Sequence, residues 1–177
     1  MKRTALLAHV LLVLTITSAF AISLETKILF NGLVEIKIPG DFTAMPADMV
    51  KIKYPSANRP DLVYTNEGYS VNIGFKHTTS RASQDQLDEY LDFMVKSLKI
   101  AYPEGKFLSN GLESVYGRNV GYLEIITTAL DTEIYNLIFF TDAEGRLLLG
   151  TFNCPASRLP EWQETALEIA LSLRVLR

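Results

Sequence analysis

His77 is the one histidine beyond the first 21 residues, and it is therefore the natural candidate for a catalytic base. A histidine near neutral pH can take a proton from a serine that an aspartate helps to orient, and serines and aspartates are plentiful here. No Gly-x-Ser-x-Gly elbow occurs, however, to place such a serine on a sharp strand-to-helix turn. We favour an exposed histidine at a strand end over a hydrolase centre.

Cys154 is the only cysteine, so the chain cannot close an internal disulfide. Because it ends an apolar strand pattern, we expect a buried, unreactive thiol rather than a nucleophile. One histidine and one thiol are too few for a zinc site. The acidic residues from Asp85 to Asp92 lack the ligand order and central glycine of a calcium loop, so we interpret them as a solvated helix face.

Cofactor motifs are absent from the sequence. Neither Gly-x-x-x-x-Gly-Lys-Ser/Thr nor Gly-x-Gly-x-x-Gly occurs, so neither common nucleotide cradle is present. We predict no catalytic residue, no metal site and no cofactor. The chain carries a formal net charge of −3, which makes it a poor ligand for the phosphate backbone of nucleic acids.

The first 21 residues have the pattern of a secretory signal peptide. Met1-Lys2-Arg3 is a short basic start, an apolar run follows from Ala5 to about Ile16, and Ala19 and Ala21 suit cleavage after Ala21. We expect residues 22–177 to form one exported domain, periplasmic or secreted. The alternative is an uncleaved anchor or a buried first helix. No later apolar run approaches the ~20 residues that span a bilayer.

Period-two patterns predict the strands. Lys27–Phe30 and Leu33–Ile38 flank Asn31-Gly32, which is typical of a two-residue hairpin turn. The stretch 49–54 is interpreted as a strand, although Pro46-Ala47-Asp48 could open a helical turn. A second hairpin joins Leu62–Thr65 to Ser70–His77. Three further strands are expected over residues 118–128, 133–141 and 146–154, the middle one covered on both faces.

Two amphipathic helices are expected. The first follows a capping box at Ser83 to Gln86 and presents Leu87, Leu91, Met94 and Leu98 on one face. The second begins near Pro160, where a missing backbone donor costs little, and presents Trp162, Ala166, Ile169 and Leu173. Because both helices are apolar on one side, each should pack on the sheet. The fold class is therefore α+β, with an antiparallel sheet flanked by helices.

Two groups of residues are candidates for binding. Asn72, Asn136 and Asn153 interrupt apolar strands, so they either line a polar pocket or are edge or core amides with satisfied hydrogen bonds, which we favour. The proline-containing loop Tyr54–Pro60 provides the second group. Its possible contact residues for a protein partner are Tyr54, Arg59, Tyr64 and Tyr69, with ordinary loop packing as the favoured alternative.

The order of elements, together with phrases such as Ile38-Pro39-Gly40-Asp41-Phe42 and the Tyr-Pro-x-x-x-Arg-Pro loop at Tyr54 to Pro60, resembles the PsbP-like α/β/α sandwich. Within that family it resembles the small exported bacterial proteins similar to DcrB. The resemblance covers Lys27 to Leu176. It implies a protein that acts without catalysis, as an accessory subunit, chaperone or partner-binding protein, and it implies no site residue.

Three functional hypotheses follow. The first is an exported, non-enzymatic binding or accessory protein of the cell envelope that engages a protein partner. The second is a carrier of a small amphipathic or lipid ligand, in a pocket between a helix and the sheet lined by Tyr90, Met94, Phe139 and Trp162. The third is a hydrolase that uses His77.

Overall fold

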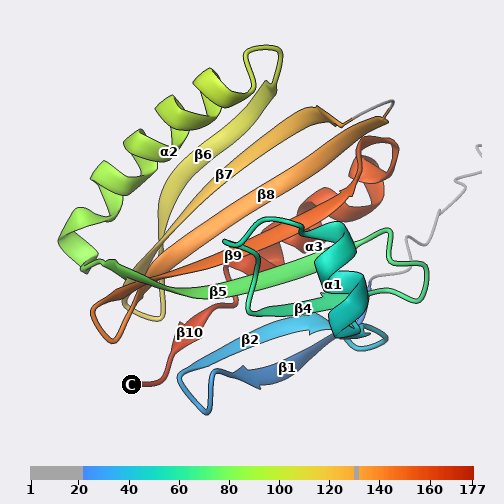
Figure 1. The fold of residues 1–177 in the computed structure, drawn as a ribbon. Helices are drawn as coiled ribbons and strands as arrows, with labels where there is room; N and C mark the ends of the chain where they lie inside the picture. Colours follow the sequence, from blue (N-terminus) through green and yellow to red (C-terminus); the bar gives the residue numbers. More distant parts are fainter. Residues whose placement is uncertain (1–21, 130–131) are drawn as a thin grey trace, which may run out of the picture.

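The computed structural model describes residues 22–129 and 132–177 (Figure 1). Over these residues the chain forms two antiparallel sheets, three α-helices and two short 3-10 turns. The elements in chain order are β1 Leu24–Leu29, β2 Val34–Pro39, β3 Thr43–Ala44, α1 Ala47–Lys53, β4 Leu62–Thr65, β5 Asn72–Arg81, α2 Leu87–Ala101, β6 Lys106–Val115, β7 Arg118–Ala129, β8 Thr132–Ala143, β9 Arg146–Pro155, α3 Leu159–Ala170 and β10 Arg174–Val175. The expected α+β class is confirmed.

The large sheet has seven strands in the order β3-β4-β5-β9-β8-β7-β6. Its centre is the expected meander, in which β8 pairs with β7 on one side and with β9 on the other. Because β8 is an interior strand, its side chains are buried on both faces. Tyr135, Leu137 and Phe139 belong to one core, and Phe140 belongs to the other.

Two glycines allow the β8 aromatic rings to lie flat against neighbouring strands. A Cβ at Gly150 would be 2.1 Å from the ring of Phe139, and a Cβ at Gly121 would be 2.2 Å from the ring of Phe140. These rings occupy the space that a side chain on the paired residue would fill. Both glycines are therefore part of the packing on opposite faces of the sheet.

The first core lies between the large sheet and a layer made of α3 and the small sheet β1-β2-β10. Trp162, Ala166 and Ile169 of α3 are buried here, as their helical spacing predicts, and Leu173 is buried just beyond the helix. β2 contributes Val34, Ile36 and Ile38, all fully buried.

The second core lies beneath α2, on the other face (Figure 1). Leu87 and Leu91 are buried against Leu123, Ile125 and Phe140, which confirms the predicted apolar face of the helix. At the start of this helix the predicted capping box is different in detail. The Ser83 hydroxyl donates to Oε1 of Gln86 at 2.9 Å, so the two side chains bind each other and neither caps a backbone N–H.

The strand expected at residues 49–54 is wrong, because this stretch is part of the helix α1. Pro46 precedes the helix, and its carbonyl accepts a hydrogen bond from the Val50 N–H at 2.9 Å. Asp48 in the first turn and Lys51 and Lys53 in the last turn complement the helix dipole. No residue of α1 is buried, so its apolar side chains do not mark a buried strand, as the sequence pattern had suggested.

Two further differences concern turns and edges. The first hairpin turns through four residues, 30–33, rather than two, with positive φ at Phe30, Asn31 and Gly32. The ten-residue edge strand β6 and the short strand β10 were not predicted from the sequence. Both lie at sheet margins, where few apolar residues are needed and the period-two signal is weak.

The helices of the described residues are too short or too polar to cross a membrane. The predicted signal peptide at residues 1–21 lies outside the described residues.

Candidate functional site

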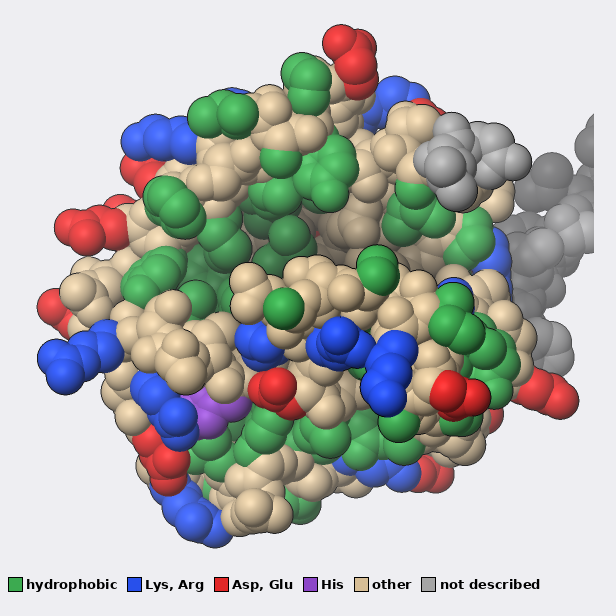
Figure 2. All heavy atoms as spheres, in the orientation of Figure 1, with side chains coloured by type: hydrophobic (Ala, Val, Ile, Leu, Met, Phe, Trp, Pro, Cys, Tyr) green, Lys and Arg blue, Asp and Glu red, His purple; other side chains and the backbone are tan. Residues whose placement is uncertain are grey.

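A groove opens on the α2 face of the large sheet, between the end of α2 and the loop that follows α1. We call it the α2 groove, and its cavity has a volume of about 300 Å³. Figure 2 shows the hollow in the middle of this face, with apolar side chains inside it and basic side chains along its lower edge. The lining residues are Tyr54, Asn58, Pro60, Gly74, Phe75, Lys76, Leu98, Tyr102, Ile125, Thr127, Asn136, Ile138, Leu149, Thr151 and Asn153.

The loop wall is held close to the sheet by Gly74. A Cβ at this position would be 2.9 Å from Cγ of Pro60 and 3.0 Å from the Thr151 hydroxyl, so only glycine lets the loop approach β5 this closely. Asp61 N–H donates to the Phe75 carbonyl at 2.8 Å, and the Lys76 ammonium donates to the Arg59 carbonyl at 2.9 Å. The loop wall is thus bound to β5 at Phe75 and Lys76, the two residues that follow Gly74.

The three asparagines share one row across the sheet, because Asn72 pairs with Asn153 and Asn153 pairs with Asn136. Two of them meet in the floor of the groove, where Asn153 Nδ2 donates to Asn136 Oδ1 at 2.6 Å. Asn136 in turn donates to the Thr127 hydroxyl at 3.1 Å. Asn72 is engaged elsewhere, since its Oδ1 accepts from the Thr65 hydroxyl at 2.8 Å.

Two residues that line the groove carry a polar atom with no hydrogen-bond partner among the described residues. Oδ1 of Asn153 accepts no hydrogen bond from the described residues, and the Tyr54 hydroxyl makes none with them either. Burial raises the pKa of Tyr54 to about 12, so the hydroxyl stays neutral and available as a donor at physiological pH. Half-buried polar groups of this kind are normally satisfied by water or by a bound molecule.

A second, more polar cavity of about 520 Å³ continues from the α2 groove along β5. The two cavities share Asn58, Lys76 and Leu149. The second one adds the acidic side chain of Asp61 and the hydroxyl-bearing stretch Thr78–Ser80. The combined groove therefore changes at Lys76 from a mainly apolar lining to one that is about equally polar and apolar.

His77 follows Lys76 but has no catalytic neighbours among the described residues. Its Nε2 lies 3.0 Å from the Ala143 carbonyl, and its Nδ1 lies 3.4 Å from the Arg146 guanidinium. Its ring also lies beside Phe30, at 6.0 Å between centroids. No hydrogen bond joins the ring to a described serine or carboxylate, so the geometry of a Ser/His/Asp triad is not formed around it.

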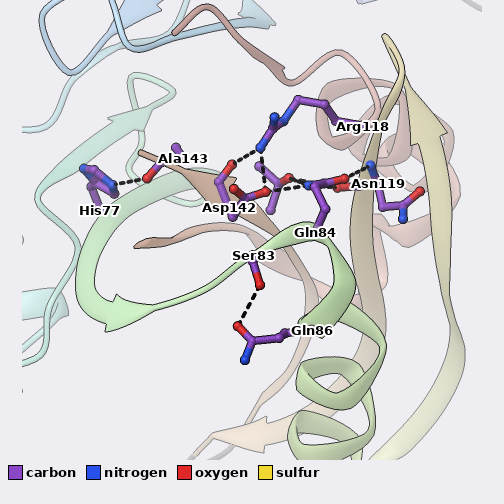
Figure 3. A network of polar contacts seen from close by, with 9 residues as sticks. His77, Ser83, Gln84, Gln86, Arg118, Asn119, Asp142 and Ala143 are labelled. Carbon is purple, nitrogen blue, oxygen red and sulfur yellow. Dashed lines mark hydrogen bonds and ion pairs between the residues drawn. The ribbon is translucent and has the colours of Figure 1, made fainter. Parts of the chain in front are cut away.

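Asp142, which precedes Ala143 in the sequence, belongs to a separate network (Figure 3). Its Oδ1 accepts from Arg118 and from Gln84 Nε2, each at 2.6 Å. Gln84 Oε1 accepts from the backbone N–H of Asn119 at 2.5 Å. The network fastens the start of α2 to the ends of β7 and β8, and so fixes the helix that forms one groove wall.

The four residues expected to contact a partner do not line a single cavity. Tyr54 lines the α2 groove, whereas Arg59 and Tyr64 line a neighbouring cavity of about 300 Å³ between α1 and β4. Tyr69 lies in the β4–β5 turn at a φ of +54°, and its carbonyl accepts from the Lys53 ammonium at 2.5 Å.

The four residues expected to line a helix–sheet pocket are divided between the two cores. Tyr90 and Met94 pack beneath α2, while Phe139 and Trp162 are buried beneath α3. Strand alternation is the reason, because Phe139 and Phe140 point to opposite faces and the sequence does not say which helix covers which face. On the helix side the groove is lined instead by Leu98, one turn beyond Met94, and by Tyr102, which directly follows α2.

Cys154 is fully buried on β9, as expected for an unreactive thiol. Burial raises its pKa to about 11. The acidic residues of the first half of α2 are exposed, and no group of three metal-ligating side chains occurs among the residues that the structure describes.

No protein-family model and no curated protein matches the chain. Solved structures do match. Cyanobacterial PsbP from Synechocystis aligns at a TM-score of 0.61 and 14% identity, over 89% of this chain and 95% of its own. The Ran-binding protein Mog1p of Saccharomyces cerevisiae aligns at a TM-score of 0.57 and 11% identity, over 88% of this chain and 97% of its own. LpqN of Mycobacterium tuberculosis, involved in cell envelope biogenesis, aligns at a TM-score of 0.52 and 12% identity, over 80% of this chain and 82% of its own.

These likenesses concern the fold, because the identities are low. The chain has the PsbP/Mog1-like fold, so the resemblance to PsbP that the sequence indicated is confirmed at that level. The narrower resemblance to DcrB stays a prediction.

Proposed function

We propose that this chain, which has the PsbP/Mog1-like fold, is a non-enzymatic binding protein that holds an amphipathic molecule in the α2 groove. One observation carries the proposal. The groove combines apolar surfaces from Leu98, Ile125 and Ile138 with polar atoms that have no partner among the described residues. Binding sites for small molecules characteristically pair an apolar lining with a few convergent polar groups.

The absence of a catalytic arrangement around His77 supports binding over hydrolysis. The imidazole contacts a backbone carbonyl and an arginine within the described part of the chain, and neither can serve as a nucleophile. The Tyr54 hydroxyl and the Asn136–Asn153 pair can orient a ligand by hydrogen bonds, but they provide no means to cleave it.

A groove-filling substitution tests the proposal. Thr151→Trp places an indole on the floor beside Gly74 and should reduce binding of the uncharged fluorescent probe N-phenylnaphthylamine at least about tenfold, because the apolar space is then occupied. The matched control is Thr26→Trp on the exposed edge strand β1, outside the groove, which should bind as the unsubstituted protein does.

Fluorescence titration measures both variants, and circular dichroism checks that each is folded. Native mass spectrometry of the protein purified from its source should in addition show a co-purifying small mass. Failure of the unsubstituted protein to bind the probe, together with no co-purifying mass, would contradict the proposal.

A protein partner is a second candidate, supported by apolar side chains on the outer face of α2. Phe93 and Ile100 are 66% and 83% exposed and lie two turns apart on that helix. Mog1p, which has the same fold, is described as a Ran-binding protein. Recovery of a stoichiometric partner from the cell envelope, lost on Phe93→Asp and retained on Lys96→Asp, would favour this candidate.

We also propose export, with cleavage after Ala21 and a single domain over residues 22–177. The secretory pattern of the first 21 residues supports it, and LpqN of the same fold is involved in cell envelope biogenesis. Intact-mass measurement of the exported protein should give a chain that begins at Ile22. A chain retaining Met1 in the cytoplasm would contradict it.

A further inference from the structure

Lys76 occupies the boundary between the two parts of the combined groove. It lines both the α2 groove, with its apolar wall from Leu98 and Tyr102, and the more polar cavity that continues along β5. A ligand lying along the groove would therefore pass from apolar to more polar surroundings beside the Lys76 ammonium.

This ammonium is half-buried and only partly satisfied. One of its three N–H donors binds the Arg59 carbonyl at 2.9 Å, and no carboxylate of the described residues lies within 4 Å of it. A half-buried cation without a counter-charge favours an anion placed next to it, because the local dielectric is lower than that of water.

The other charges around this point are few. Asp61 lines the polar cavity, but its Oδ2 already accepts a hydrogen bond from the His77 backbone N–H at 3.0 Å. The helix α1 carries Lys51 and Lys53 with Asp48, and the loop that follows it carries Arg59. Figure 2 shows basic side chains along the lower edge of the hollow. The balance of charge at the loop wall is positive.

We propose that the ligand of the α2 groove is an amphipathic anion, whose apolar chain lies beneath α2 and whose anionic head binds the Lys76 ammonium. This inference rests on the proposed function and adds to it the chemical class of the ligand. The shared chemistry is an apolar group that ends in a carboxylate or phosphate.

Isothermal titration with three ten-carbon probes of different charge tests the assignment. Decanoate should bind more tightly than decanol, and decanol should bind at least as tightly as decyltrimethylammonium. Lys76→Met should weaken decanoate binding about tenfold, the effect expected for one charge-assisted hydrogen bond. It should weaken decanol binding much less, because only the lost contact with the Arg59 carbonyl affects the uncharged probe. Decyl phosphate in a fourth titration distinguishes a phosphate head from a carboxylate head.

Two further variants control for charge and structure. Lys53→Met removes the same charge from α1, outside both cavities, and should change decanoate binding less than twofold or so. Asp61→Asn removes the one acidic side chain of the polar cavity and should strengthen decanoate binding about two- to threefold.

The outcomes separate the two proposals. The inference is wrong if decanol binds but decanoate binds no more tightly, or if Lys76→Met weakens binding of both probes equally. The groove is then a binding site for uncharged molecules. Tighter binding of the cationic probe would also overturn it. If no probe binds, the proposed function itself fails.

Discussion

Asn136 and Asn153 show how far single residues can be interpreted from the sequence. Their types alone indicated that each amide needs a hydrogen-bond partner if it is buried. The structure supplies that partner by pairing the two residues directly across β8 and β9, at 2.6 Å. The sequence could not give this pairing, because it depends on the register of two strands.

The groove residues missed from the sequence share one property. Thr151 and Ile138 have ordinary strand patterns, and Leu98 and Tyr102 continue an ordinary apolar helix face. Nothing in their spacing distinguishes a side chain that meets another surface from one that lines an opening. The sequence offered a signal at Tyr54, which lies in a proline-containing loop, and at Asn136 and Asn153, which interrupt apolar strands.

At the residue scale, the raised pKa values of one cysteine and two tyrosines predict how the stability of the protein depends on pH. Burial raises the pKa of Cys154 from 9.0 to about 11 and that of Tyr54 from 10.0 to about 12, and burial with a hydrogen bond to Glu124 raises that of Tyr135. Each raised pKa favours the neutral form in the folded state, so the stabilisation is complete below about pH 9. It is lost as the pH rises, because the unfolded chain ionises first.

We therefore expect the free energy of unfolding to fall above about pH 9, by up to about 1.4 kcal/mol per pH unit for each ionising group. Urea denaturation at a series of pH values measures this. Cys154→Ala should lower overall stability but flatten the earliest part of the decline. A stability that is constant to pH 11 would contradict the expectation.

At the scale of elements, α1 and β6 mark where sequence patterns carried least information. α1 has apolar residues that remain unburied, so its composition resembled a strand, while Pro46 before it and the placement of Asp48, Lys51 and Lys53 favoured a helix. β6 lies at the edge of the large sheet and alternates between exposed and half-buried residues. The central strands β7, β8 and β9 were predictable because they are covered on both faces.

The packing of β8 aromatics over glycines gives an element-scale prediction. Gly150→Ala should destabilise the protein by roughly 1–3 kcal/mol, because the new methyl group would overlap the ring of Phe139 and force it from its position. Thermal and urea denaturation measure the loss.

Gly68→Ala is the matched control. Gly68 lies in the β4–β5 turn, its φ is not in the left-handed region, and the nearest atom to a new Cβ would be the Ser70 hydroxyl at 4.0 Å. This variant should stay within about 0.5 kcal/mol of the original protein. Equal effects at both glycines would show that ring packing is not the cause.

The whole molecule is built from two cores that share one sheet. The alternation of β8 was sufficient to predict that both faces are covered, but not which helix covers which face, and the predicted helix–sheet pocket was divided for that reason. The strand order β5-β9-β8 was likewise beyond the sequence, since β5 and β9 are far apart along the chain.

Because the cores share the sheet, we expect residues 22–177 to unfold in one transition. Leu91→Ala beneath α2 and Ile169→Ala beneath α3 should each cost about 2–5 kcal/mol. Trp162, the only tryptophan, reports on the α3 side by fluorescence, whereas circular dichroism reports on the whole chain. Both signals should shift together in both variants. A Leu91→Ala protein in which circular dichroism shifts and fluorescence does not would contradict the single domain.

The small sheet has a consequence for the timing of folding. β10 pairs with β2, and the Leu176 N–H donates to the Leu33 carbonyl at 2.9 Å, so one of the first strands acquires its neighbour from one of the last residues. A polypeptide that emerges amino end first, from a ribosome or from a narrow membrane pore, cannot complete this layer until residue 176 is free. During that interval the edge of β2 that β10 covers in the folded protein stays unpaired.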